Sequence, residues 1–118
     1  MSTPDAIAIH PDGAVEELTR PAGEDWLRFL YRVIGTDVVE LVHTPRSTVV
    51  VDEEGAMRAE RAENRLLTQV ARMVGGRVAP LFGVGVFTGA SRSDFRSLSE
   101  GELRAVREAI GDVAGGPH

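Results

Sequence analysis

Apolar positions along the chain recur with two periods, and these periods predict its elements. Strand-like runs of alternating or β-branched apolar residues occupy residues 6–9, 14–19, 38–42, 49–51 and 79–88. Apolar side chains recur at helical spacing between Pro21 and Gly35, over residues 61–74, and after Ser99. We therefore expect the order β-β-α-β-β-α-β-α. This order predicts an α+β fold, a mostly antiparallel sheet of about five strands with three helices packed mainly on one face.

The stretch from residue 37 to residue 55 is expected to form the floor of the domain. Two valine-rich runs in it are separated by Thr44, Pro45 and Arg46. This pattern is typical of a hairpin, or of two neighbouring strands at the centre of a sheet.

Turn and capping residues support the same order of elements. Pro11-Asp12-Gly13 lies between the first two strand-like runs and predicts a hairpin turn. Gly35 is the expected stop of the first helix, and Ser99 with Glu102 has the spacing of a capping box at the last. Glycines 83 and 85 indicate a bulge or a close backbone approach in the last strand.

Length and composition favour one small domain. A chain of 118 residues with 42% hydrophobic content can bury one core, which we assign to residues 6–112, with flexible ends at 1–5 and 113–118. The chain has no cysteine, which excludes disulfides, thiolate metal sites and a cysteine nucleophile. The N-terminal residues do not resemble a signal peptide, and no apolar run approaches a membrane span, so we expect a cytoplasmic protein without membrane contact.

The charge of the chain bears on its partners. A formal net charge of −5 argues against a general nucleic-acid binder, because phosphate neutralisation needs a surplus of positive charge. All 13 basic residues are arginines, whose planar guanidinium groups suit carboxylates and phosphates.

Arginines are the first candidates for a binding site. Those at helical spacing opposite the apolar side of the second helix are Arg58, Arg61, Arg65 and Arg72. They could grip phosphates or an acidic partner, and Arg46 in the loop 44–46 could add to this surface. The alternative is an ordinary solvated helix face balanced by Glu60 and Glu63.

Asn64 has two interpretations. It is among the preferred N-cap residues, so it could begin the second helix, or its amide could reach a ligand. If it caps, Arg61 moves into the preceding loop and the arginine stripe is broken.

Candidate catalytic groups are few. His43 would face Asp52 or Glu53 if the hairpin pairs closely, and such a group could hold a metal or pass a proton. The spacing matches no metal motif, and residues 52–54 are expected to form a solvated hairpin tip. No nucleophile elbow occurs, and Gly83-Val84-Gly85 lacks the third glycine of a dinucleotide fingerprint. We therefore assign no catalytic residue, metal site or cofactor.

Several short motifs resemble one known family. They are I-x-P-D-G-x-x-E-E over residues 9–17, D-E-E-G over residues 52–55, Asn64 with Thr68, and Gly83 with Val84. Over residues 6–88 this order resembles DUF3846, a family of small phage and actinobacterial proteins classed as a domain of unknown function. The resemblance implies an accessory protein of a mobile element or its host, a binder or regulator rather than a metabolic enzyme.

Three hypotheses for the function follow. The first is a non-enzymatic binding or regulatory protein that recognises a protein partner or an anionic ligand. The second is an enzyme with a His43–carboxylate centre or a nucleotide-handling site. The third is a DNA-associated protein, or one that mimics DNA with its acidic surface as anti-restriction proteins do. A homodimer is also expected if a valine-rich strand leaves a sheet edge uncovered.

Overall fold

The computed structural model describes residues 3–58, 61–91 and 94–115. Its elements in chain order are β1 (Ala6–Ile9), β2 (Val15–Leu18), α1 (Trp26–Ile34), β3 (Val39–His43), β4 (Thr48–Asp52), the short 3₁₀ helix η1 (Gly55–Met57), α2 (Arg65–Met73), β5 (Gly85–Thr88) and α3 (Glu100–Ala114). Apart from η1, this is the predicted order. Within the described residues, no helix is long and apolar enough to cross a membrane.

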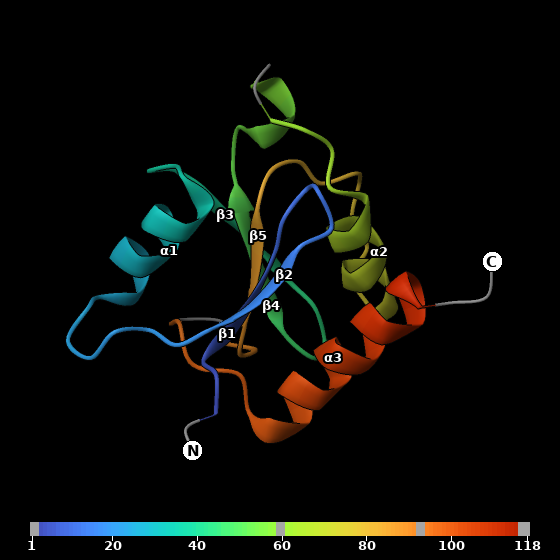
Figure 1. The fold of residues 1–118 in the computed structure, drawn as a ribbon. Coiled ribbons are helices and arrows are strands. Elements are labelled where there is room, and N and C mark those ends of the chain that lie inside the picture. Colours follow the sequence, from blue (N-terminus) through green and yellow to red (C-terminus); the bar gives the residue numbers. More distant parts are fainter. Residues whose placement is uncertain (1–2, 59–60, 92–93, 116–118) are drawn as a thin grey trace.

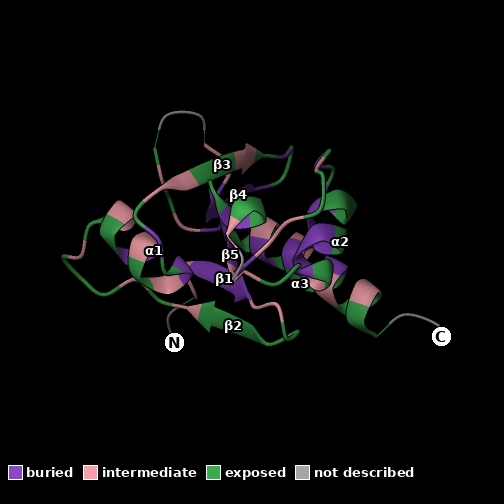
Figure 2. Ribbon diagram, turned by 90° about the horizontal axis from the view of Figure 1, so that it is seen from above, coloured by how far each residue is buried: buried purple, intermediate pink, exposed green. Residues whose placement is uncertain are grey.

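The five described strands form one antiparallel sheet in the order β2-β1-β5-β4-β3. The predicted α+β fold is confirmed. Helices α2 and α3 cover one face of the sheet and α1 covers the other, so the molecule has three layers (Figures 1 and 2).

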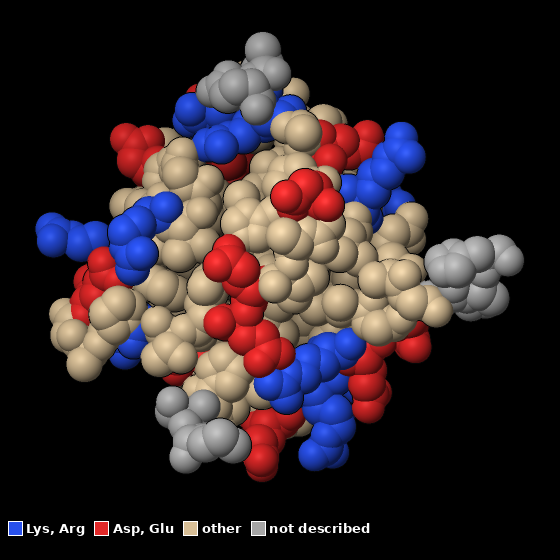
Figure 3. Space-filling view, viewed as in Figure 1, with Lys and Arg blue, Asp and Glu red and all other residues tan. Residues whose placement is uncertain are grey.

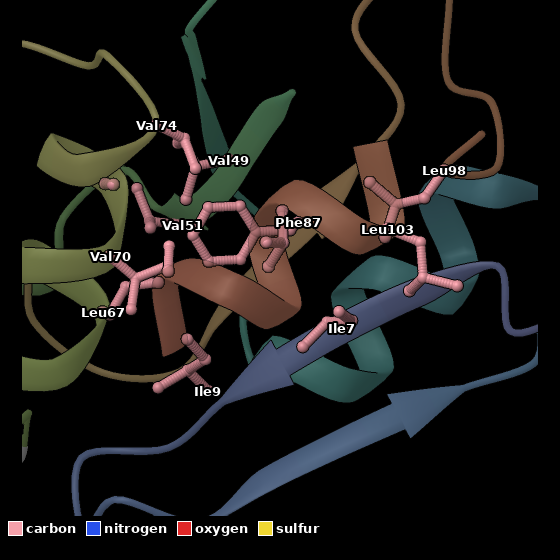
Figure 4. Close-up of a cluster of buried hydrophobic side chains, with 13 residues drawn as sticks. Ile7, Ile9, Val49, Val51, Leu67, Val70, Val74, Phe87, Leu98 and Leu103 are labelled. Carbon is pink, nitrogen blue, oxygen red and sulfur yellow. The ribbon is translucent and has the colours of Figure 1, made fainter. Parts of the chain in front are cut away.

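Each face of the sheet has its own hydrophobic core. Side chains of β1 and β4 that point towards α2 and α3 surround Phe87 of β5, which is fully buried (Figure 4). On the opposite face the small residues Ala6 and Ala8 let α1 approach closely and bury Phe29, Leu30 and Ile34. Because β1, β4 and β5 are buried on both faces, their sequences are almost continuously apolar.

The predicted hairpin of the 37–55 stretch is present, but its place in the sheet differs from the expectation. β4 is fully buried, whereas β3 lies at one edge of the sheet, with Val39 and Val42 half-buried and its other three residues exposed. The central strand is β5, which comes from a distant part of the sequence and inserts between β1 and β4. The valine-rich pattern was therefore right about the hairpin and wrong about both strands being central.

Local signals define most element boundaries. Gly13 (φ 90°) and Gly35 (φ 80°) adopt left-handed conformations at the predicted turn and helix end. The capping box of Ser99 and Glu102 is present. β5 is shorter than predicted, because the backbone turns at Gly83 (φ 78°) before the strand begins.

The predicted close approach in β5 occurs at Gly85. A Cβ atom at this position would lie 2.3 Å from Cδ2 of Leu67 in α2, well inside van der Waals contact. Glycine here lets α2 pack directly on the sheet.

Candidate functional site

The outer edge of β3 has unpaired backbone groups. Two hydrogen bonds, from the Glu53 amide to the Val38 carbonyl and from the Thr44 amide to the Ser47 carbonyl, show which residue pairs of the β3–β4 ladder are hydrogen-bonded. Hydrogen-bonded and non-hydrogen-bonded pairs alternate along an antiparallel ladder, so the N–H and C=O groups of Val39, Leu41 and His43 point away from β4. Within the described residues no hydrogen bond reaches these groups, so β3 presents an open edge (Figure 2).

An open groove of about 360 Å³ runs beside this edge. Its floor includes Val42 and Val51, and its opposite wall is the segment 77–82 that leads into β5. Its charged lining residues are Glu40, Asp52, Glu53 and Arg77. The groove lies on the α2 side of the sheet, because Val42 and Val51 pack against that core.

Asn64 and Thr68 hold the groove wall in place. The Asn64 amide donates to the Leu81 carbonyl (2.7 Å), and the Leu81 amide donates to Oγ1 of Thr68 (2.9 Å). Nδ2 of Asn64 donates to the carbonyls of Ile9 and Gly83, at 2.9 and 2.8 Å. The pair therefore links α2, β1 and the start of β5.

Asn64 is also the N-cap of α2. Its Oδ1 accepts the Leu67 amide at 3.0 Å, and its side chain is fully buried. Of the two predicted interpretations the structure shows capping, and the amide is used entirely by the protein's own backbone. As a consequence the second helix begins at Arg65 rather than at residue 61.

The predicted stripe of arginines on α2 is therefore not formed. Arg58 and Arg61 precede the helix and converge on Asp52, with Nε–Oδ2 distances of 3.0 and 3.1 Å. Arg61 also donates to the carbonyl of Gly35 at 2.7 Å, at the C-terminal end of α1. These two guanidinium groups join the segment after η1 to the sheet and to α1.

Asp52 is not part of a solvated hairpin tip. It is the last residue of β4 and is buried, and its Oδ1 accepts the Glu54 amide at 3.0 Å. Burial would raise the pKa of the Asp52 carboxyl. The Glu54 amide and the guanidinium groups of Arg61 and Arg58 outweigh burial, so the pKa lies below its ordinary value.

The remaining predicted binding residues lie apart from one another. The side chain of Arg65 is 88% exposed in the first turn of α2. Arg72 donates from Nε and Nη2 to the Val78 carbonyl, at 3.2 and 3.0 Å, and so stabilises the end of the helix. Arg46 lies in the β3–β4 turn beside residues of α3.

The His43–carboxylate group that the sequence analysis considered is not brought together in the structure. In the β3–β4 register His43 is opposite Thr48, whereas Asp52 is opposite Val39 at the other end of the ladder. The nearest polar partner of the imidazole is Oγ1 of Thr48, 3.4 Å from Nδ1. Over residues 3–58, 61–91 and 94–115 no group of three or more His, Asp or Glu side chains could hold a metal.

Charged side chains of both signs are interspersed over the surface. Figure 3 shows acidic side chains in the middle of one face, flanked by separate basic groups near η1 and near α3. Several are paired; Arg107 of α3, for example, forms a bidentate ion pair with Glu17 of β2, at 2.6 and 2.7 Å. The face drawn there shows no continuous basic surface.

Sequence reasoning did not bring together the residues that line the groove beside the open edge, chiefly Glu40, Leu41, Glu53 and Arg77. The alternation of Val39-Glu40-Leu41 was a signal for a strand with one wet face. Whether that strand is an edge depends on where β5 inserts, and local pattern does not contain this information.

Comparison with known proteins identifies the family. The family model described as a domain of unknown function (DUF3846) matches residues 4–111, which is most of the chain. Neither a curated protein nor a solved structure matches the chain. The turn Pro11-Asp12-Gly13, the pair Asn64 and Thr68, and Gly83, on which the sequence resemblance rested, all occupy defined structural positions. The chain thus belongs to the DUF3846 family.

Proposed function

We propose that this protein is a non-enzymatic binding module that recognises a partner protein by accepting one of its extended segments as a sixth strand on β3. The single observation behind the proposal is the open edge of β3, whose outward backbone groups have no partner within the described residues. Such an exposed edge pairs readily with a strand of another chain, because its amides and carbonyls already have the spacing of a ladder.

The groove beside β3 supports this proposal. In strand addition the backbone supplies affinity, and pockets beside the edge strand receive alternate side chains of the added segment. The groove lined by Glu40, Val42 and the segment 77–82 occupies that position. Leu41, which is 36% exposed, adds an apolar contact on the other face of the same strand.

Arginines are not the basis of the proposal. Arg58 and Arg61 are engaged with Asp52, and Arg46, Arg65 and Arg72 do not form one surface with them. A ligand site built on a stripe of guanidinium groups would need these residues on one helix face, and only Arg65 and Arg72 belong to α2.

Substitution of Leu41 by proline tests the proposal. The Leu41 amide points away from β4, so proline removes an outward donor while every hydrogen bond of the β3–β4 ladder keeps its donor. The Leu41→Thr variant is the matched control, because it also removes the leucine side chain but keeps the amide and suits a strand. The variants and the natural sequence are compared as baits in quantitative affinity capture from cells of the source organism.

We expect a stoichiometric partner that Leu41→Pro captures at least about ten-fold less than Leu41→Thr does. Both variants lack the leucine side chain, and only Leu41→Pro also lacks the donor on which strand addition depends. Equal capture by Leu41→Pro, with its melting temperature unchanged, would place the interface elsewhere and reject the proposal. A second copy of the chain is an alternative occupant of the edge. In that case sedimentation equilibrium shows a dimer that Leu41→Pro converts to a monomer.

A further inference from the structure

We propose that the segment added to β3 presents a Lys or Arg side chain directly after an apolar residue, with the basic group between Glu40 and Glu53 and the apolar one on Leu41. This inference rests on the proposed function and specifies the chemistry of the partner. Three features of the molecule carry it: the register of β3, the charges of the groove and the exposure of Leu41.

The register decides which side chains of an added strand enter the groove. Glu40 and Val42 point towards the α2 side, whereas Val39 and Leu41 point towards the α1 side. An added strand has its side chains on the same face as the β3 residues directly opposite. The residue opposite Glu40 therefore enters the groove, and its neighbour opposite Leu41 lies on the other face.

Charge decides what the groove accepts. Glu40 is opposite Val51 and Glu53 follows the end of β4, so the two carboxylates lie on the same face at one end of the ladder. Neither forms an ion pair within the described residues, and both are exposed. Asp52 is already paired with two arginines, which leaves two carboxylates against the single guanidinium group of Arg77.

A basic side chain fits this lining better than an acidic or neutral one. An acidic residue opposite Glu40 would place like charges across a close pair, which is destabilising. The net charge of −5 acts in the same direction at longer range, because it favours the approach of basic segments.

The apolar requirement comes from the opposite face. Leu41 is one of the few large hydrophobic side chains that are substantially exposed in the described structure. An apolar residue directly opposite would cover it. In an antiparallel arrangement, the one the whole sheet uses, the residue opposite Leu41 precedes the residue opposite Glu40.

The other edge of the sheet does not offer the same chemistry. In β2 the carboxylate of Glu17 is held by Arg107, and Glu16 contacts His10. These acidic side chains are occupied within the protein, so the β2 edge lacks the unpaired carboxylates that distinguish β3.

A peptide selection tests the inference even before the natural partner is identified. A phage library of random seven-residue peptides is selected in parallel on the full natural chain and on Leu41→Pro. We expect peptides specific to the natural chain to be enriched in an apolar residue followed by Lys or Arg. Enrichment of other sequences, without a basic residue, would overturn the inference while leaving the proposed function intact. If the selection yields no peptide specific to the natural chain, both the inference and the proposed function are overturned.

Charge variants give the decisive measurement on a peptide obtained in this way. Glu53→Gln removes a negative charge from the groove and should weaken the binding of the synthetic peptide about two- to five-fold, whereas Arg77→Gln should strengthen it by a similar factor. Both changes in affinity should become smaller as the salt concentration is raised. Changes of the same sign in the two variants, or no change in either, would show that the groove does not recognise the basic side chain.

Discussion

At the scale of single residues, Asn64 joins several parts of the fold through its hydrogen bonds. Its side chain caps α2 and its Nδ2 satisfies two carbonyls from different parts of the sheet. The backbone amide of the same residue fixes the groove wall at Leu81. A buried amide with every group satisfied stabilises one arrangement of its neighbours and penalises others.

Replacing Asn64 with alanine should lower the free energy of unfolding by about 2–4 kcal/mol, since it removes an N-cap and leaves the Ile9 and Gly83 carbonyls without a buried donor. Urea denaturation followed by circular dichroism measures this. Glu63→Ala, at the exposed neighbouring position, is the control and should change stability by less than about 0.5 kcal/mol. If both variants are equally stable, the hydrogen bonds of Asn64 contribute little.

At the scale of elements, the ion pairs around Asp52 join parts of the chain that the sheet alone does not hold. Arg58 and Arg61 connect the segment after η1 to the end of β4 and to the C-terminal turn of α1. Buried carboxylates are strongly unfavourable when they lose their partners.

The capping box of α3 also holds a carboxylate in its charged form. Burial there opposes ionisation of Glu102, but hydrogen bonds from Arg96 and Ser99 outweigh it and lower the pKa of Glu102 to about 2.

Arginine substitutions should therefore separate structural from surface roles. Arg61→Ala should lower the free energy of unfolding by about 1–3 kcal/mol, because Asp52 keeps its burial and loses a hydrogen-bonded cation. Arg65→Ala should leave it within about 0.5 kcal/mol, since that side chain is 88% exposed. Thermal unfolding of both variants at pH 7 gives the comparison. Equal melting temperatures would contradict a structural role for Arg61.

At the scale of the whole molecule, one sheet separates two hydrophobic cores that share β1, β4 and β5. Because these strands contribute alternate side chains to both cores, loss of either core exposes one face of the same sheet. We therefore expect the two sides to unfold together.

Leu30→Ala tests this expectation. Leu30 of α1 is fully buried against the sheet, and its truncation should lower the free energy of unfolding by about 2–5 kcal/mol. The single tryptophan, Trp26, reports on the α1 side, while far-ultraviolet circular dichroism is dominated by all three helices. In urea the two signals should shift together in the variant. Separate transitions would mean that the α1 side unfolds on its own.

Short-range signals in the sequence determined the elements and their ends. The periods of two and 3.6, the Pro11-Asp12-Gly13 turn, the stop at Gly35 and the Ser99–Glu102 capping box act within a few residues, so they can be recognised from neighbouring residues alone. They predicted the element order and the α+β class correctly.

Only the tertiary structure decided which strand is an edge, and which charged residues are paired. β5 inserts between β1 and β4 and leaves β3 outside, and the same assembly buries Asp52 against two arginines while moving His43 to the far end of the ladder. These outcomes depend on contacts between residues distant in sequence, whose energies no local pattern contains. The open edge of β3, from which the binding function is proposed, belongs to this second class.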